Sequence, residues 1–450
     1  MIGNPLLLGD EGGYKLTRSL RFRSSASAYL NRTVSTASNR KTYTWSGWVK
    51  RGVLGVQQGI FGSNNAATYP RTNFYFTASN TLNLFDEDAA GGNIGVLETT
   101  QVFRDPAAWY HIVFAVDTTQ ATSTNRVKFY VNGTQITSFT TATYPTLNFE
   151  GQINNTSYPQ TIGRIDGGNY LDGYMAEVNF IDGQALTPSS FGASSPYNQW
   201  LPKKYAGTYG TNGFYLPFTN NASTTTLGYD FSPQGNNWTT NNISVTAGST
   251  YDSMTDVPTL TSATAANFAV ISPLWPASYS NGSITNGNLT ALITAISSKN
   301  CFASMPLPTS GKIYYELTST YSASGMIVGV TATPSGNDPT TAGSNVYGYY
   351  NANGNKYNNG TGTAYGTAWY TSGQTYTIGV AYDADAGTLV FYLNNTSQGT
   401  AFTLTTGVSY FPTAGNVSGS GNNTINWNFG QQPFTYTPPS GFLALNTFNL

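Results

Sequence analysis

Three acidic residues stand in a row in the sequence, Asp86, Glu87 and Asp88 after Phe85. Glycoside hydrolysis needs two carboxylates that flank one sugar bond, about 5–9.5 Å apart. Successive residues of a strand point to opposite faces of a sheet, so three consecutive acids do not share the face that this reaction needs. The run is therefore interpreted as a solvated strand end or turn, and the sequence favours a protein without hydrolase activity.

The chain has one histidine, His111, and one cysteine, Cys301. A single histidine cannot form a metal cluster of two histidines, and no Ser-His-Asp set is evident around it. Strand alternation places His111 on the face opposite Tyr110 and Ile112, which predicts a structural role. Cys301 is predicted to be an inert buried thiol. With no internal disulfide available, maturation in a reducing cytosol is expected.

Asp117 and Asp383 each end an apolar strand immediately before a polar turn. Aspartate often accepts hydrogen bonds from the backbone amides of such turns, so both are predicted to be turn residues. Asp383 and Asp385 are two residues apart and could share a face, but the sequence DADAG is also typical of a turn.

The most suggestive surface segment is residues 346–370, which are rich in tyrosine and asparagine and include Trp369. Aromatic rings stack on sugars, and amides can bind hydroxyl groups. Two interpretations stay open: packing within a core and its loops, or a contact surface for a glycan or a protein. For the second interpretation the candidate ligand-binding residues are Tyr349, Tyr350, Tyr357 and Trp369.

Two similar hairpins organise these residues. WYHIVFAVD (109–117) precedes KFYVNGTQI (128–136), and YTIGVAYDA (376–384) precedes TLVFYLNNT (388–396). Alternating apolar and polar residues put one face of each strand on a core, and asparagine tolerates the positive φ of tight reversals. The repetition predicts two β-sandwich domains of related architecture.

Composition supports an all-β fold and excludes two classes of partner. Charged residues are 9% of the chain and aromatic residues 14%, with 48 glycines and a net charge of −1. Ordinary soluble domains are about 25% charged. No basic stripe is present for nucleic acid, and no apolar run is long enough for a membrane span. The start of the chain lacks the basic region of a signal peptide.

Strand-like segments divide the chain into four parts. We predict an N-terminal arm (1–16), a first sandwich (17–197), an ordered connector with short strands (198–266) and a second sandwich (267–450). The fold class is therefore all-β, with two tandem antiparallel β-sandwich domains of the jelly-roll type. The helix-like segment 288–298 is assigned to strand.

The first sandwich resembles the concanavalin A-like, laminin-G-like jelly rolls. The resemblance is carried by SLRF (19–22), YTWSGWVKRG (43–52), AWYHIVFAVD (108–117) and YLDGYMAEVNFIDGQALTPSSFG (170–192). By analogy with laminin-G modules, Asp86 or Asp88 is an alternative calcium ligand, since Ca²⁺ takes hard oxygen ligands. Otherwise no metal or other cofactor is expected.

The second sandwich resembles a SPRY domain, on the segments GKIYYELTST (311–320), MIVGVTAT (326–333), VYGYYNANGNKYNNG (346–360), TYTIGVAYDADAGTLVFYLNNTSQG (375–399) and YFPTAGNVSGSGNNTINWNFGQQPF (410–434). The order of the two domains, the joining sequence YGTNGFYLPF (209–218) and the ending FTYTPPSGFLALNTFNL (434–450) together resemble virion structural proteins of tailed bacteriophages.

That resemblance implies a non-enzymatic virion protein, in a tail fibre or a fibre attached to the capsid. Host-surface glycan adhesion or particle decoration would be its role, with assembly in the host cytoplasm and release by lysis. The alternatives are a carbohydrate-active enzyme of concanavalin A-like fold and a protein-interaction module of the cellular type.

Assembly is expected to involve aromatic and apolar residues outside the sandwich repeats. Leu6, Leu7 and Leu8 are predicted to anchor the arm to a neighbouring chain, and Trp200 and Trp238 to lie at contacts of the connector. A surface with few charges does little to keep copies apart. A homo-oligomer is expected, and the virion resemblance favours a trimer over a dimer.

Overall fold

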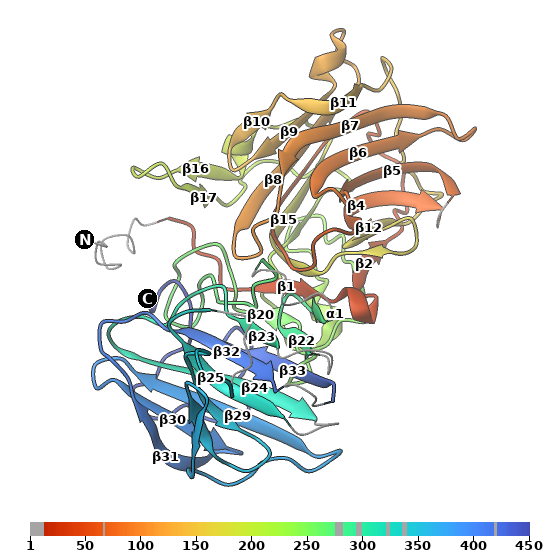
Figure 1. The fold of residues 1–450 in the computed structure, drawn as a ribbon. Coiled ribbons are helices and arrows are strands. Elements are labelled where there is room, and N and C mark those ends of the chain that lie inside the picture. The colour runs from red at the N-terminus through yellow and green to blue at the C-terminus, as the bar shows by residue number, and fades with distance from the viewer. Residues whose placement is uncertain are drawn as a thin grey trace. The chain divides into compact units, whose positions relative to one another are not determined.

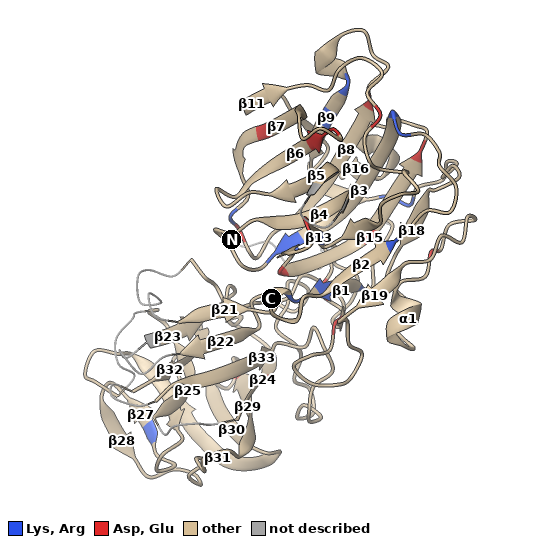
Figure 2. Ribbon diagram, turned by 90° about the vertical axis from the view of Figure 1, so that its right-hand side faces the viewer, with Lys and Arg blue, Asp and Glu red and all other residues tan. Residues whose placement is uncertain are grey.

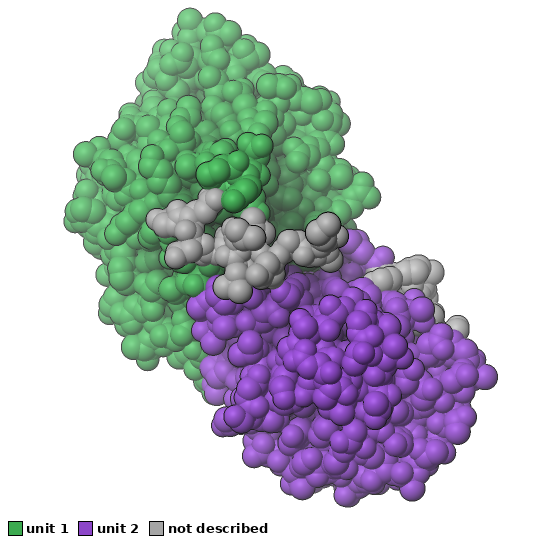
Figure 3. Space-filling model, turned by 90° about the vertical axis from the view of Figure 1, so that its left-hand side faces the viewer, with its two compact units in different colours: residues 1–246, 251–261 green, residues 247–250, 262–450 purple. Residues whose placement is uncertain are grey.

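The computed structural model describes residues 13–65, 68–274, 282–293, 299–320, 325–334, 340–417 and 421–450. The chain divides into unit 1 (1–246 and 251–261) and unit 2 (247–250 and 262–450), shown in Figure 1 and Figure 3. The only α-helix among the described residues is the single turn α1 (Thr224–Leu227). The prediction of an all-β chain with two antiparallel β-sandwiches is confirmed.

Unit 1 contains two large antiparallel sheets. In spatial order, the A sheet consists of β10 (Thr134–Ile136), β9 (Val127–Val131), β8 (Trp109–Asp117), β3 (Thr42–Arg51), β15 (Gly173–Asp182), β1 (Ser19–Phe22) and β20 (Ser253–Met254), with β18 (Phe214–Leu216) also paired to β15. The B sheet consists of β11 (Phe139–Thr143), β7 (Asn93–Val102), β6 (Thr81–Glu87), β5 (Thr68–Phe76), β4 (Gln58–Asn65), β12 (Gln160–Ile162), β2 (Tyr29–Arg32) and β19 (Thr239–Asn241).

Smaller elements of unit 1 lie outside these sheets. They are the strand pairs β13 (Arg164–Ile165) with β14 (Asn169–Tyr170) and β16 (Gly192–Ser194) with β17 (Trp200–Pro202), and the 3₁₀ turns η2 (Ser24–Ala26), η3 (Ser123–Asn125) and η4 (Pro188–Ser190).

Strand alternation builds the main core of unit 1. Trp45 on β3, Phe114 on β8 and Phe74 on β5 are fully buried, and the rings of Phe74 and Phe114 stack with centroids 4.3 Å apart. These large rings come from both sheets, so the core lies between them. Burial of a ring of this size contributes roughly 1.5–3 kcal/mol to the free energy of unfolding.

A second, smaller core covers part of the outer face of the A sheet. Val113 and Tyr130 from the strands pack with Phe191, Tyr205 and Tyr209, which follow β15 in the chain. These residues cover the outward side chains of β8 and β9, which are therefore only partly exposed to solvent. Among the described residues, no similar apolar cluster covers the outward side chains of β5, β6 and β7.

The segment predicted as a connector is mostly part of the first sandwich. Its strands pair within unit 1: β18 with β15, β19 with β2, and β20 with β1. Trp238 and Phe214 belong to the main core. Residues 198–246 and 251–261 therefore complete unit 1, and 247–250 and 262 onward cluster with unit 2.

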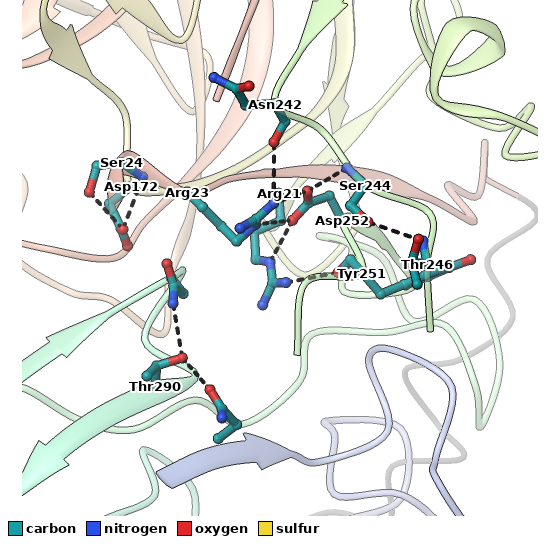
Figure 4. Close-up of polar contacts among 12 residues, drawn as sticks. Arg21, Arg23, Ser24, Asp172, Asn242, Ser244, Thr246, Tyr251, Asp252 and Thr290 are labelled. Atoms are coloured by element: carbon teal, nitrogen blue, oxygen red, sulfur yellow. Dashed lines mark hydrogen bonds and ion pairs between the residues drawn. The ribbon is translucent and has the colours of Figure 1, made fainter. Parts of the chain in front are cut away.

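Buried ion pairs hold the end of this segment. Asp252 accepts from Nε of Arg21 at 3.1 Å and from Nε of Arg23 at 2.8 Å, and the backbone N–H of Ser244 donates to its other oxygen (Figure 4). Asp256 pairs with the buried Lys50 ammonium at 2.8 Å. Burial lowers the pKa of Lys50, while Asp256 counteracts that shift. The outer face of the A sheet thus carries ion pairs that a simple two-layer sandwich would not bury.

Unit 2 also contains two antiparallel sheets. The C sheet runs β21 (Ser283–Thr285), β22 (Thr290–Ile293), β33 (Asn423–Asn428), β24 (Lys312–Thr320), β29 (Thr375–Asp383), β30 (Thr388–Leu393) and β31 (Thr396–Thr403). The D sheet runs β23 (Lys299–Phe302), β32 (Phe411–Asn416), β25 (Met326–Thr331), β26 (Val346–Tyr350), β27 (Lys356–Asn358) and β28 (Thr361–Thr363). The strand prediction for 288–298 is confirmed at Thr290–Ile293, and residues 294–298 lie outside the described part.

Both predicted hairpins are present. β8 pairs with β9, and β29 pairs with β30. The reversal after β9 uses Asn132 (φ 47°) and Gly133 (φ 81°), and the one after β30 uses Asn394 (φ 46°) and Asn395 (φ 70°). Two successive positive φ values are typical of the tight turns that match the twist of paired strands.

Charged residues are unevenly divided between the units, as the blue and red parts of the ribbon in Figure 2 show. Residues 262–450 contain seven of them: Lys299, Lys312, Glu316, Asp338, Lys356, Asp383 and Asp385. The remaining surface of unit 2 is supplied by neutral side chains. No helix in the described ranges is long and apolar enough to span a membrane.

Candidate glycan-binding face

Two of the four predicted ligand-binding aromatics are core residues. Tyr349 and Trp369 are fully buried, with ring centroids 5.6 Å apart, and the Tyr349 hydroxyl donates to the backbone oxygen of Thr367. Their rings are not available to stack on a ligand, which favours the packing interpretation for both. Tyr350 and Tyr357 are half-buried and pack edge to face at 5.4 Å, so only these two could contribute to a contact surface.

The residues predicted to make assembly contacts differ in their burial. Trp238 is 2% exposed and packs against Phe214 at 4.8 Å, so the expectation that it lies at a contact between chains is corrected to a core role. Trp200 is half-buried on β17. Leu6, Leu7 and Leu8 lie outside the described residues.

His111 has the structural role predicted for it. It is buried, and its Nδ1 accepts a hydrogen bond from the Trp200 indole N–H at 2.9 Å. An indole nitrogen can only donate, so the neutral ring carries its proton on Nε2, which then donates to the Ser46 hydroxyl at 2.9 Å. Burial lowers the pKa of His111 to about 3. The imidazole therefore cannot accept a proton from Ser46, and this pair is not a nucleophile with its base.

The turn roles of Asp117 and Asp383 and the burial of Cys301 are confirmed. Asp117 accepts from the backbone N–H of Thr119 at 3.1 Å, and Asp383 accepts from that of Ala386 at 3.0 Å. Cys301 is buried, and its thiol donates to the backbone oxygen of Ala414 at 3.3 Å.

The two alternative calcium ligands have separate surroundings. Asp86 points inward from β6, and burial raises its pKa to about 7, partly offset by a hydrogen bond with Thr72. Asp88 accepts from the backbone N–H groups of Ala90 and Gly92 at 2.9 and 2.8 Å, as a turn residue does. Within the described ranges, no group of three or more His, Cys, Asp or Glu residues is arranged to hold a metal.

A face that sequence reasoning missed lies on the outside of the B sheet. Phe74, Phe76, Leu82, Leu84 and Leu97 point into the main core. The residues that alternate with them point outward, and we call the following set the Tyr75 face: Asn73, Tyr75, Asn83, Phe85 and Glu98.

Strand register assembles this face from three strands. Tyr75 on β5 is opposite Asn83 on β6, and Asn83 is opposite Glu98 on β7. Asn73 is opposite Phe85 in the neighbouring row. Because directly opposed residues have Cβ atoms about 4.5–5.5 Å apart, an aromatic ring, an amide and a carboxylate stand side by side across the sheet.

The β13–β14 hairpin borders the face on the β4 side. A Cβ at Gly59 would lie 2.5 Å from the backbone of Arg164, so the hairpin rests directly on β4. From this hairpin Asp166 accepts a hydrogen bond from Asn73 at 2.6 Å and pairs with Arg71 at 3.0 Å. The guanidinium of Arg71 also lies 4.9 Å from the centre of the Phe85 ring. These contacts fix the edge of the face.

The Tyr75 face offers both a hydrogen-bond donor, the phenol of Tyr75, and an acceptor, the carboxylate of Glu98. Burial, followed by the charges of Asp166 and Glu98, raises the pKa of Tyr75 to about 12, so its phenol remains a donor at neutral pH. Glu98 accepts from the Thr81 hydroxyl at 2.7 Å. A half-buried ring with adjacent donors and acceptors can stack on an apolar sugar face and bind its hydroxyls.

Asn83 is the residue with unused hydrogen-bonding capacity. It is 4% exposed, its side chain bonds to no other described residue, and its Oδ1 is buried. A buried amide without partners costs about 1–3 kcal/mol. The alternating segments NFYF (73–76) and TLNLF (81–85) carried the signal for this face, but only the pairing of three strands shows which residues stand together.

Comparisons with known proteins agree with the two-domain reading. Residues 23–190 match the Laminin_G_3 family, described as the concanavalin A-like lectin/glucanases superfamily, and residues 312–432 match the SPRY domain. The chain thus contains a concanavalin A-like domain and a SPRY domain. No curated protein matches it.

Several solved structures show partial likeness. The SPRY domain of human HERC1 is 21% identical, with a TM-score of 0.29, covering 33% of this chain and 91% of that one. A heptameric SAP-like pentraxin from Limulus polyphemus is 18% identical, with a TM-score of 0.28 and coverage of 38% and 78%. A "putative carbohydrate binding protein" from Bacteroides ovatus is 17% identical, with a TM-score of 0.32 and coverage of 51% and 59%. At these TM-scores the likenesses carry no argument about function.

Proposed function

We propose that the protein is a non-enzymatic binding protein whose unit 1 holds a glycan on the Tyr75 face. The observation that carries the proposal is the position of Asn83. Its nearly buried amide lies between the ring of Tyr75 and the carboxylate of Glu98, and its side chain has no hydrogen-bond partner among the described residues. The amide nitrogen of Asn83, which no other described residue accepts from, would donate to a sugar hydroxyl while the ring of Tyr75 stacks on the sugar. The match to the concanavalin A-like lectin/glucanases superfamily supports this role.

The charges around the face favour a neutral or basic sugar. Glu98, Asp166 and Glu87 are acidic, and Arg71 pairs with two of them, Glu87 at 2.5 Å and Asp166 at 3.0 Å. Glu98 is not in an ion pair among the described residues, so an anionic sugar beside it would be repelled.

Binding to an array of neutral, basic and acidic oligosaccharides tests the proposal. Tyr75→Leu should weaken the best ligand roughly twofold to tenfold, since an aromatic contact contributes about 0.5–1.5 kcal/mol. Asn83→Ala should weaken it as well. Tyr69→Leu is the matched control, because Tyr69 lies on the same strand and is 51% exposed. Equal binding by all three variants and the native chain would sink the proposal.

Binding without hydrolysis or a metal is the second part of the proposal. It is supported by the surroundings of His111 and by the separate roles of Asp86 and Asp88. We expect no reducing-sugar release from bacterial surface polysaccharide, and a melting temperature that a chelator leaves within about 2 °C. A chelator-induced fall of more than ~5 °C would mean that a metal stabilises the fold by more than ~1 kcal/mol.

The setting that we propose is the virion of a tailed bacteriophage, as a tail fibre or a capsid-attached fibre, assembled in the host cytoplasm and released by lysis. This part rests on the sequence order of the two domains and the connector. The N-terminal arm with Leu6, Leu7 and Leu8 would attach the chain, and removal of residues 2–13 should stop its incorporation into particles. Normal incorporation of the shortened chain would refute this.

A protein-interaction role for unit 2 is the second candidate. The SPRY match supports it, and Tyr350 and Tyr357 are half-buried aromatics at its surface. A pull-down with isolated virion proteins, comparing the native chain with Tyr357→Ala, distinguishes this role from glycan binding by unit 1.

A further inference from the structure

A pocket of about 240 Å³ opens on the other sheet of unit 1, at the edge of the small outer core. Its lining residues are Ala115, Asp117, Gln120, Asn125, Lys128, Tyr130, Ala185, Leu186 and Thr187. β8 and β9 supply the floor, the turn between them supplies one rim, and the segment after β15 supplies the opposite wall.

The hollow arises from a small residue among large ones. Ala115 is paired with Lys128, and Val113 with Tyr130, so all four point to the outer face of the A sheet. Because Ala115 has only a methyl group, it leaves space between Lys128, Tyr130 and the wall residue Leu186.

Hydrogen bonds fix the walls. The backbone N–H of Leu186 donates to the Thr44 hydroxyl at 2.8 Å, and that hydroxyl donates to the backbone oxygen of Gln184 at 2.7 Å. On the other rim, Arg126 donates to the backbone oxygens of Gln120 and Ala121 at 2.9 and 3.0 Å. The pocket is therefore formed before any ligand arrives, which lowers the entropy cost of binding.

The two charged residues of the lining differ in their bonding. Asp117 accepts hydrogen bonds from Thr119, from Gln120 at 2.6 Å and from Thr42 at 3.3 Å. Burial alone would raise the pKa of Asp117, but these hydrogen bonds outweigh burial and lower it. Lys128 is half-buried, and no hydrogen bond or ion pair joins its ammonium group to another described residue.

Tyr130 adds a second donor. It is 8% exposed, and its hydroxyl makes no hydrogen bond to the described part of the chain. Burial raises its pKa, so the phenol keeps its proton. An ammonium and a phenolic O–H in one pocket are matched by an anion that accepts from both.

The pocket and its charge define the class of anion. With one cation and the Asp117 carboxylate in the same lining, a monoanion is favoured over a phosphate dianion. The volume is below the roughly 300–1,000 Å³ of pockets for drug-sized ligands, so it suits one small group. The amide oxygen of Gln120, whose nitrogen donates to Asp117, and the amide of Asn125 lie at the rim and suit sugar hydroxyls.

We propose that this pocket binds the carboxylate of a single uronic acid residue, with Lys128 and Tyr130 as its donors. The site is separate from the Tyr75 face, since the two lie on outward faces of different sheets, and neither proposal depends on the other.

Saturation-transfer NMR on the full chain, with glucuronate, glucose and propionate as probes, tests the proposal. Glucuronate should bind more tightly than either of the others, and its affinity should fall with added salt. Lys128→Gln should weaken glucuronate at least about tenfold, because a hydrogen bond to a charged group is lost. Lys204→Gln is the control, with the same change of charge at an exposed lysine outside the pocket.

A second variant protects the test against misfolding of the first. Ala115→Val fills the hollow with two methyl groups, keeps Lys128 and retains good strand propensity. It should abolish glucuronate binding while the binding of oligosaccharides to the Tyr75 face persists. Unchanged glucuronate affinity in the folded Lys128→Gln or Ala115→Val variant overturns the proposal. Glucose or propionate binding as tightly as glucuronate overturns the assignment to a uronic acid.

Discussion

Glu177 is a buried carboxylate held by two phenols. It is 4% exposed, and its Oε2 accepts from Tyr215 at 2.9 Å and from Tyr14 at 3.3 Å. It lies where the pairing of β15 with β3 shifts register, with a φ of 52°. Burial raises its pKa to about 7, although both hydrogen bonds act in the opposite direction.

This residue predicts a pH dependence. Because its folded-state pKa lies above its usual value of 4.5, the folded chain binds more protons than the unfolded chain between pH ~4.5 and ~7. Stability from Glu177 therefore falls as the pH rises through that window. Glu177→Gln should be stabilised relative to the native chain by an amount that grows from near zero at pH 4 to at most about 3 kcal/mol at pH 8.

Urea denaturation of both chains at pH 4, 6 and 8 checks this difference. The comparison between the two chains removes the contributions of Asp86, whose raised pKa acts in the same direction, and of His111, whose lowered pKa acts in the opposite one. A stability difference that stays constant with pH would contradict the assignment. Glu98→Gln serves as the control carboxylate at a half-buried site.

Residue roles were predictable from the sequence where they depend on the residue's own strand. The outward position of His111 and the turn role of Asp117 follow from alternation and local hydrogen bonding. Tyr349 could not be placed, because its burial depends on a ring contact with Phe391 of β30. Trp369 packs in turn on the ring of Tyr349, so its burial could not be predicted either. Asn83 was missed for the same reason, since its neighbours Tyr75 and Glu98 come from different strands.

At the scale of elements, the segment after Tyr197 has more structure than its mixed composition indicated. It contributes β18, β19 and β20 to the two sheets of unit 1. The hairpins were predictable, because their strands adjoin in sequence. The pairing of β20 with β1 joins residues more than two hundred positions apart, and no local pattern specifies it.

The ion pairs of Asp252 should stabilise the pairing of β20 with β1. Asp252→Asn leaves Arg21 and Arg23 buried without a compensating charge, and we expect a loss of about 3–5 kcal/mol in the free energy of unfolding of unit 1. Glu150→Gln breaks ion pairs of an exposed carboxylate and should cost about 0–1 kcal/mol.

Thermal melting followed by tryptophan fluorescence distinguishes the two variants. At roughly 2–4 °C per kcal/mol, Asp252→Asn should melt about 6–20 °C lower than the native chain. Similar melting temperatures for the two variants would show that residues 251–261 are held mainly by their packing.

For the whole molecule, each unit has its own sheets and its own core, and the two differ in charge. The half-buried Trp200 and the neutral surface leave the proposal of a homo-oligomer in place, with Trp238 removed from its candidate contacts. Interfaces favour tyrosine and tryptophan over lysine and glutamate.

Light scattering at micromolar concentrations should give a mass near three times the 48.2 kDa of one chain. Closed symmetry avoids open-ended growth, and the preference for a trimer over a dimer rests on the resemblance to virion fibre proteins. A mass of 48.2 kDa at every concentration would instead assign the neutral surface to solubility or to ligand contact.

The sparse charge of unit 2 has an environmental consequence. Dissolved ions shorten the reach of charge–charge attraction to about 3 Å at 1 M, but they have little effect on ring stacking or on amide hydrogen bonds. With seven charged side chains in residues 262–450, attachment through unit 2 would keep its strength from fresh water to brine. The Lys128 pocket, in contrast, would release its ligand as salinity rises. One chain would then combine a binding site that tolerates salt with a binding site that is sensitive to it.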